Sequence, residues 1–267
     1  MLRAFSLLIS GLLLLALTCG CQQGETSDRL LLSGQTMGTT WSLNMVPGSP
    51  GTDSAVLKQL LQARLDQING LMSTYDPESE LSRFNNLAST DWYPVSEDTA
   101  RVIEVSQEIS ALSDGAFDIS IGPLVELWGF GAAERRAKIP TEEQISNNLA
   151  RVGYNNIHLR REPTAIRKQI PGLQIDLSAV AKGYAVDALA KILEQQGVNN
   201  YLLEIGGELK ISGHRGDDRP WQIAIEEPLE EVREVATIFP LTNTALATSG
   251  NYRNFYVEDG QRYSHTI

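Results

Sequence analysis

The stretch 175–187 constrains this chain most, because a strand pattern becomes a helix pattern within a few residues. Apolar and polar side chains alternate over 173–177, which predicts a half-buried strand. From Ala181 onward, apolar side chains recur at helical spacing. Ser178 is predicted to cap this helix and Gly197 to end it. The chain should therefore place a strand end and a helix start next to each other.

Lys182 falls in the predicted first turn of that helix, where the positive end of the helix dipole disfavours a cation. A negative group is therefore expected nearby. Free backbone N–H groups together with one lysine form a simple anion site, most simply for phosphate. A lysine side chain extending into solvent explains the local sequence equally well.

The N-terminus reads as an export signal. Arg3 precedes a mostly apolar run over 4–17, and Thr18-Cys19-Gly20-Cys21 follows. This resembles the bacterial lipoprotein signal, with 1–20 removed, Cys21 lipidated and 21–29 serving as a tether; Cys19 is a weaker alternative. The run is shorter than the roughly 20 apolar residues of a membrane span. We therefore expect lipid anchoring on the periplasmic side, more plausibly of the inner membrane.

The composition excludes other classes of protein. Both cysteines lie in the signal region, which leaves none in the mature domain for a disulfide or a thiolate metal site. A formal net charge of −11 without a basic cluster argues against nucleic acid as a partner. An acidic protein that binds a phosphate compound needs a metal cation or a helix terminus to do so.

The remaining patterns predict an α+β fold, since helices are interleaved with antiparallel hairpins. Loop residues Met37 and Tyr75 are each predicted either to pack in place or to contact a flat ring. Helices are expected at 53–72, at 96–112, and after a capping box at Thr141 and Gln144. Strands are expected at 30–33, 40–45, 116–123, 157–161, 165–170, 201–205, 209–212, 221–225, 255–257 and 262–267.

Several short motifs follow one another along nearly the whole chain after the tether. They are Thr36-Met37-Gly38-Thr39, Ser82-Arg83-Phe84-Asn85, Asp114-Gly115-Ala116-Phe117-Asp118, Gly122-Pro123-Leu124-Val125, Leu127-Trp128-Gly129-Phe130-Gly131, Asp176-Leu177-Ser178, Gly206-Gly207, Ser249-Gly250-Asn251-Tyr252-Arg253 and Ser264-His265-Thr266-Ile267. In order and spacing, and together with the lipoprotein signal, they resemble the ApbE family of bacterial FAD:protein FMN transferases.

The resemblance implies a single T-fold-like domain over 30–267, built from antiparallel sheets with packed helices. It also implies an Mg²⁺-assisted enzyme that cuts the pyrophosphate of FAD, releases AMP and attaches FMN to a threonine of a partner protein. Such partners include subunits of sodium-pumping NADH:quinone reductase and of Rnf-type complexes.

Site residues also follow from the resemblance. The positions matching FAD contacts are Met37, Tyr75, Ala116, Phe117, Asp118, Asp176, Lys182 and Ile267. Ala179 matches a position whose backbone carbonyl, a hard oxygen, binds the metal. His265 is expected to take the proton from the attacking threonine, although a lone histidine on a terminal strand is more often structural.

Similar proteins continue beyond His-Thr-Ile with an Asp-Pro-x-Thr-Gly turn and a later Asp and Thr that complete the metal site. This sequence lacks both segments, so we expect a fragment or a protein without those metal side chains. Two other functions stay open. One is an FAD pyrophosphatase in which water replaces threonine, and the other is a non-catalytic, lipid-anchored flavin-binding protein.

Overall fold

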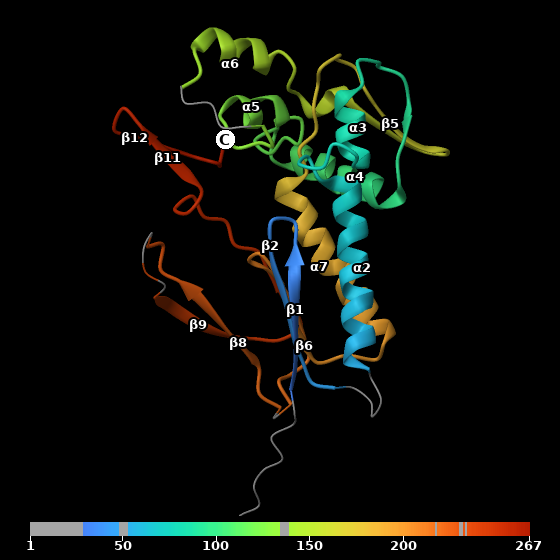
Figure 1. Cartoon of the computed structure of the whole chain (residues 1–267), viewed down its shortest axis with the longest axis vertical. Coiled ribbons are helices and arrows are strands. Elements are labelled where there is room, and N and C mark those ends of the chain that lie inside the picture. Colours follow the sequence, from blue (N-terminus) through green and yellow to red (C-terminus); the bar gives the residue numbers. More distant parts are fainter. Residues whose placement is uncertain (1–28, 48–52, 134–138, 217, 230–231, 233) are drawn as a thin grey trace, which may run out of the picture.

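The computed structural model describes residues 29–47, 53–133, 139–216, 218–229, 232 and 234–267. The signal at 1–20 and the lipidation site Cys21 lie outside these residues. The described elements form one α+β domain of antiparallel sheets and packed helices, which confirms the predicted fold class (Figure 1). None of the described helices has the length and hydropathy needed to span a membrane.

The central sheet has five antiparallel strands in the order β1-β2-β6-β7-β10. They are β1 (Leu30–Thr36), β2 (Thr39–Met45), β6 (Tyr201–Ile205), β7 (Glu208–Ser212) and β10 (Thr244–Leu246). Met37 and Gly38 form the two-residue turn between β1 and β2, with φ values of 48° and 71°. Such left-handed pairs match the twist of a tight hairpin, so the strands extend further into the polar loop than predicted.

Helices α2 (Ser54–Met72) and α7 (Ser178–Gln195) lie side by side against this sheet (Figure 1). Leu57, Leu61, Leu65, Ile68 and Met72 form the buried face of α2, and Leu60 beside them is 43% exposed. Asp53 caps α2, because its carboxylate accepts the backbone N–H groups of Ala55 and Val56. Gly197 ends α7 with φ of 74°, as predicted. The main core lies between these helices and the sheet.

Gly34→Ala should lower the free energy of unfolding by about 1–3 kcal/mol, because a β-carbon on β1 has no room. It would lie 2.5 Å from Trp41 Nε1 and 2.7 Å from Gln62 Oε1, two atoms that hydrogen-bond to each other. Denaturant titration measures the effect. Gly70→Ala in α2 is the control: its β-carbon meets nothing within 4 Å, and the helix should gain about 0.5–1 kcal/mol. Equal stability of the two variants would contradict this packing argument.

A second layer carries the site. Its helices are α3 (Glu80–Asn86), α4 (Glu97–Leu112), α5 (Gly122–Leu127) and α6 (Glu142–Leu149), and a short 3₁₀ turn, η2 (Tyr154–Asn156), precedes the strands. A small sheet in the order β3-β5-β4 completes it, from β3 (Tyr93–Pro94), β4 (Ile157–Arg161) and β5 (Thr164–Lys168). The predicted caps are confirmed: Ser96 caps α4, and Thr141 with Gln144 forms the capping box of α6.

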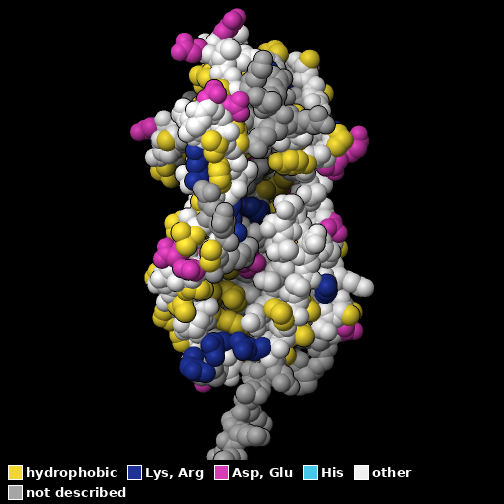
Figure 2. Space-filling view, turned by 60° about the vertical axis from the view of Figure 1, so that its left-hand side comes forward, with side chains coloured by type: hydrophobic (Ala, Val, Ile, Leu, Met, Phe, Trp, Pro, Cys, Tyr) yellow, Lys and Arg dark blue, Asp and Glu magenta, His cyan; other side chains and the backbone are white. Residues whose placement is uncertain are grey.

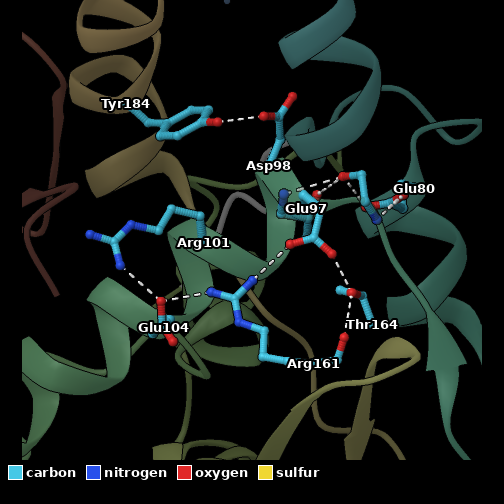
Figure 3. Close-up of polar contacts among 10 residues, drawn as sticks. Glu80, Glu97, Asp98, Arg101, Glu104, Arg161, Thr164 and Tyr184 are labelled. Carbon is cyan, nitrogen blue, oxygen red and sulfur yellow. Dashed lines mark hydrogen bonds and ion pairs between the residues drawn. The ribbon is translucent and has the colours of Figure 1, made fainter.

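Polar contacts tie α4 to its neighbours (Figure 3). Asp98 accepts two hydrogen bonds from Arg64 of α2, at 2.7 and 2.8 Å, and one from the Tyr184 hydroxyl of α7. The hydrogen bond from Arg64 holds the pKa of Asp98 below its ordinary value. Burial, followed by the contact with Asp98, raises the pKa of Tyr184 to about 12. Tyr184 therefore stays a neutral donor, and the three helices share one half-buried junction.

The C-terminal strands form two hairpins, β8 (Trp221–Glu226) with β9 (Val235–Leu241) and β11 (Phe255–Glu258) with β12 (Gln261–Ser264). Trp221 and Ile223 build a small second core with Ile211 of β7. Strands β9 and β10 were not predicted. Among the described residues β9 pairs only with β8, and the first six residues of β9 are exposed. It therefore lacks the buried alternation that sequence patterns detect, and it tolerates Pro240.

The predicted strand at 173–177 is wrong, although its alternating burial is correct. The segment is extended but forms only one bridge, between Gln174 and Ile121. Its other backbone groups are satisfied outside any sheet: Ile175 exchanges two hydrogen bonds with the Asn85 side chain, and Asp176 N–H donates to the Ile119 carbonyl. A side-chain amide thus replaces a neighbouring strand.

The predicted strand at 116–123 is also wrong. Residues up to Ser120 form turns, and α5 begins at Gly122. The Asp118 carboxylate accepts the backbone N–H and the hydroxyl of Ser120, at 2.7 and 2.6 Å, and the Tyr154 N–H at 2.8 Å. Short polar side chains of this kind favour turns over strands, because they bond to nearby backbone groups.

Candidate functional site

A hollow of about 330 Å³ opens between α3, α5 and the extended segment that leads into α7. It takes residues from segments far apart in the sequence. Its lining is Thr74, Tyr75, Pro77, Ser82, Asn85, Asn86, Gly122, Glu126, Ala132, Ala133, Gln174, Ile175 and Asp176. Of the predicted FAD contacts, the fold brings Tyr75 and Asp176 together here.

Asp176 occupies the point where the extended segment becomes helix α7. Its carboxylate accepts the Ser178 N–H at 2.7 Å and so satisfies one of the free donors at the helix start. The predicted Ser178 cap is therefore wrong: Ser178 is the first residue of the helix, and its hydroxyl makes no cap hydrogen bond. Serine and aspartate are about equally good capping residues, and here the carboxylate two positions earlier takes the role that the sequence pattern gave to Ser178.

Tyr75 lines the same hollow from the loop between α2 and α3. Ser73 fixes its loop, because the Ser73 hydroxyl accepts the N–H groups of Tyr75 and Asp76, each at 3.1 Å. The phenol is 67% exposed and donates to the Phe130 carbonyl at 3.4 Å. Burial, and then the charge of Asp176, raises the pKa of Tyr75. The site therefore presents a neutral, accessible aromatic ring.

Two further lining residues were missed as site residues. Glu126 of α5 accepts the N–H groups of Ala132 and Ala133, at 2.7 and 3.1 Å, and so folds the next loop over the hollow. Gly131 leaves room for this carboxylate, since a β-carbon there would collide with it. Asn85 belongs to one of the family motifs, Ser82-Arg83-Phe84-Asn85. Its contact with Ile175 joins residues 90 positions apart, so no local sequence pattern predicts it.

The segment 116–118 does not line this hollow. Ala116 is exposed, Phe117 packs against the main core, and the Asp118 carboxylate is occupied by Ser120 and Tyr154. Asp118 therefore stabilises the local turn in this structure, and its predicted contact with FAD stays a prediction.

Met37 lines a second hollow of about 480 Å³, formed by 35–40 around the β1–β2 turn. Met37 is partly buried and packs against the main core. The buried Thr36 hydroxyl beside it makes no hydrogen bond within the described residues. Met37 thus lines a different hollow from the one that Tyr75 and Asp176 line.

Lys182 has a protein partner. It is the fifth residue of α7, one turn later than predicted, and its Nζ lies 2.9 Å from Glu208 Oε1. Its side chain lies beside Gly206 and Thr39, close to the β1–β2 turn. The negative group expected near Lys182 is thus Glu208. A phosphate contact would have to share the lysine with this carboxylate.

Ala179 is exposed in the first turn of α7, beside the carboxylate of Asp176. A backbone carbonyl and a carboxylate are hard oxygen donors of the kind that Mg²⁺ prefers. Within the part of the chain that the structure describes, no group of three or more His, Cys, Asp or Glu side chains is arranged to hold a metal. The predicted contact between the Ala179 carbonyl and Mg²⁺ therefore stays a prediction.

His265 follows β12 and is held by aromatic contacts. Its ring lies 6.5 Å from the Phe130 ring. Tyr256 of β11 packs against Phe130 in a tilted arrangement, and Tyr263 of β12 stacks on Trp128. Since Tyr75 bonds to the Phe130 carbonyl, Phe130 links the first hollow to His265. Ile267 is 46% exposed beyond β12, which ends at Ser264 rather than at the predicted 267.

Comparison with known proteins identifies the family. The ApbE family matches residues 37–267. A FAD:protein FMN transferase of Vibrio cholerae is 41% identical over 266 residues, which is 100% of this chain and 78% of the relative. The chain belongs to the ApbE family. A second FAD:protein FMN transferase, from Escherichia coli K12, is 41% identical over 93% of this chain and 73% of its own length.

Solved ApbE structures share the fold. The flavin transferase ApbE from Vibrio cholerae superposes with a TM-score of 0.81 at 40% identity, covering 89% of this chain and 75% of that one. The apo flavinyl transferase ApbE from Pseudomonas stutzeri gives 0.80 at 36% identity, covering 90% and 74%. The ApbE fold expected from the motifs is therefore confirmed.

Proposed function

We propose that this chain transfers FMN from FAD to a partner protein. Its ApbE relatives carry the name of this activity at 38–41% identity over nearly the whole chain. The observation that carries the proposal is the hollow that Tyr75 and Asp176 line together, beside residues of α3 and α5. An exposed aromatic ring suits a flat heterocycle, and a carboxylate suits the hydroxyl or amine donors of a nucleotide.

In finer detail, we propose a threonine hydroxyl as the acceptor. Its oxygen attacks the phosphorus of the FMN half of FAD, the bond from that phosphorus to the bridging oxygen breaks, and AMP leaves with the bond electrons. The hydroxyl proton passes to a base. In such a displacement the protein mainly positions the reactants and neutralises charge.

His265 is the proposed base. Its Nδ1 lies 3.2 Å from the Asn254 carbonyl, and a carbonyl can only accept, so this contact requires a proton on Nδ1. Nε2 then carries the lone pair that can receive the threonine proton. The side chain is exposed, as a base must be when its substrate is the side chain of another protein.

Mg²⁺ is proposed as the assisting cofactor, with the Ala179 carbonyl as its contact and FAD phosphate oxygens as further ligands. When bound, it would neutralise charge on the phosphates. The roles of Tyr75, Asp176 and His265 are defined without it, and the predictions for them do not depend on its geometry.

Incubating the purified chain with FAD, Mg²⁺ and a threonine-bearing acceptor domain tests the proposal. Mass spectrometry should find an acceptor that carries FMN, and chromatography should find AMP in equal amount. An acceptor domain with that threonine replaced by alanine is the matched control and should stay unmodified. Free FMN with AMP would instead indicate an FAD pyrophosphatase, and unchanged bound FAD would indicate a flavin-binding protein.

Subunits of sodium-pumping NADH:quinone reductase and of Rnf-type complexes are the proposed acceptors, and a lipid on Cys21 is the proposed anchor. β1 begins at the lower end of the molecule in Figure 1, whereas α3 and α5, which line the hollow, lie at the other end. Lys and Arg side chains gather near that lower end (Figure 2), where they would face anionic headgroups. The hollow would then open away from the bilayer toward its partner.

Cys21→Ser should convert a membrane-bound protein into a soluble periplasmic one, since the single lipid attachment point is lost. Fractionation of washed membranes measures this, and Cys19→Ser is the matched control that should stay in the membrane. Retention of the Cys21 variant in washed membranes would contradict a lipid anchor on that residue. Detection of residues 1–20 on the mature protein by mass spectrometry would contradict cleavage after Gly20.

A further inference from the structure

Lys168, the last residue of β5, is a lysine inside the main core. Its side chain is 1% exposed, and its Nζ donates to three backbone carbonyls: Phe84 at 3.2 Å, Asn85 at 3.0 Å and Leu173 at 3.1 Å. An ammonium has three N–H donors, and all three are used. Burial lowers the pKa of Lys168. A neutral amine has only two N–H bonds, so the three carbonyls fit the charged form.

These carbonyls belong to two segments that form one wall of the hollow. Phe84 and Asn85 lie in the last turn of α3, where a cation is favourable, and the Phe84 carbonyl also accepts the N–H of Leu87, which follows the helix. Leu173 begins the extended segment that ends at Asp176. One buried ammonium thus ties the end of a helix to a segment that no sheet holds.

The Asn85 side chain completes the tie. Its amide donates to the Ile175 carbonyl and its oxygen accepts the Ile175 N–H, each at 2.8 Å. Asn85, Ile175 and Asp176 all line the hollow, whereas Lys168 does not. Any influence of Lys168 on a bound molecule must therefore pass through these neighbours.

We propose that Lys168 is a positioning residue that holds Asn85 and the segment 173–176, and with them the Asp176 carboxylate, in the geometry that binds FAD. This inference rests on the proposed function. In enzymes, a displacement of about 1 Å at a site can lower the reaction rate by about 100-fold, which shows how sensitive such sites are to geometry. Lys168→Met keeps the length and the apolar stem and removes all three donors, so we expect the Kd for FAD to rise by about 10-fold or more.

The matched control is Lys58→Met, the same replacement at an exposed position of α2. Its Kd for FAD should stay within about twofold of wild type. Thermal unfolding of each variant sets a temperature at which both are folded. Hydrogen exchange of a peptide covering 173–177 should accelerate in Lys168→Met and not in Lys58→Met. If Lys168→Met does not fold, Lys168→Gln, which is uncharged but keeps two donors, replaces it with the same expected direction.

A double-mutant cycle separates positioning from general stability. If Lys168 acts through Asp176, adding Lys168→Met to Asp176→Ala should weaken FAD binding by less than about twofold further. Full additivity, or an unchanged Kd in Lys168→Met while Asp176→Ala weakens binding, would overturn the inference and leave the proposed function intact. A wild-type protein that does not bind FAD would instead overturn the proposed function, and the inference with it.

Discussion

His265→Ala is expected to lower the rate of FMN transfer by about 100-fold or more, because a general base typically contributes 10²–10⁴-fold. FAD affinity should change by less than about threefold, since His265 lies directly after β12 and is not among the residues that line the hollow. Single-turnover transfer at saturating FAD and acceptor measures the rate. Added imidazole should restore part of it, a result that a merely structural role would not produce.

His214→Ala is the matched control for that experiment. His214 is exposed in the loop after β7, and its backbone N–H donates to the Asn200 side chain at 2.9 Å. The loop follows Ser212, which pairs with Tyr201, and Tyr201 in turn pairs with Met45 opposite Leu30. His214 therefore lies at the end of the sheet where β1 begins, and its loss should leave transfer within about twofold. Undiminished transfer by His265→Ala would eliminate His265 as the base.

Asp176→Ala should raise the Kd for FAD by about 10- to 100-fold, the equivalent of about 1.5–3 kcal/mol for a hydrogen bond to a charged group. It should also lower the free energy of unfolding by about 1 kcal/mol, because Ser178 N–H loses its acceptor at the start of α7. Fluorescence titration with FAD and denaturant unfolding measure the two effects separately.

Asp176→Asn distinguishes the two roles of this residue. Its amide oxygen can still accept the Ser178 N–H, so stability should stay close to wild type, while the negative charge facing Tyr75 is lost. FAD binding should be weakened in both variants. If titration showed wild-type affinity in both, Asp176 would cap α7 without contacting FAD, and the site would have to lie elsewhere.

The elements predicted correctly are those with local signals. Helices α2, α4 and α6 are capped by Asp53, Ser96 and Thr141, whose side chains accept backbone N–H groups two or three residues further on. The β6–β7 hairpin could also be predicted from local sequence, because Gly206 and Gly207 separate two predicted strands. In each case the stabilising contact lies inside the pattern that predicted it.

The two wrong strands fail for a common physical reason. At 116–123 and 173–177 the apolar residues alternate as in a strand, but polar groups complete the backbone hydrogen bonding. Asp118 closes its own turn, and Asn85 takes the place of a partner strand beside Ile175. Alternation reports which side chains are buried, and it does not report what the backbone bonds to.

By itself, the sequence determined the fold class, the ApbE family and two residues, Tyr75 and Asp176, that share one hollow. Only the tertiary structure decided that Lys182 pairs with Glu208 and that the buried Lys168 holds the wall carrying Asp176. Family motifs and helix caps consist of residues that are close together in the sequence, so a single stretch of sequence is enough to identify them. Contacts between side chains tens of residues apart depend on the tertiary fold, which brings those residues together. The sequence pattern of a strand is the same whether its lysine extends into solvent or donates to three buried carbonyls.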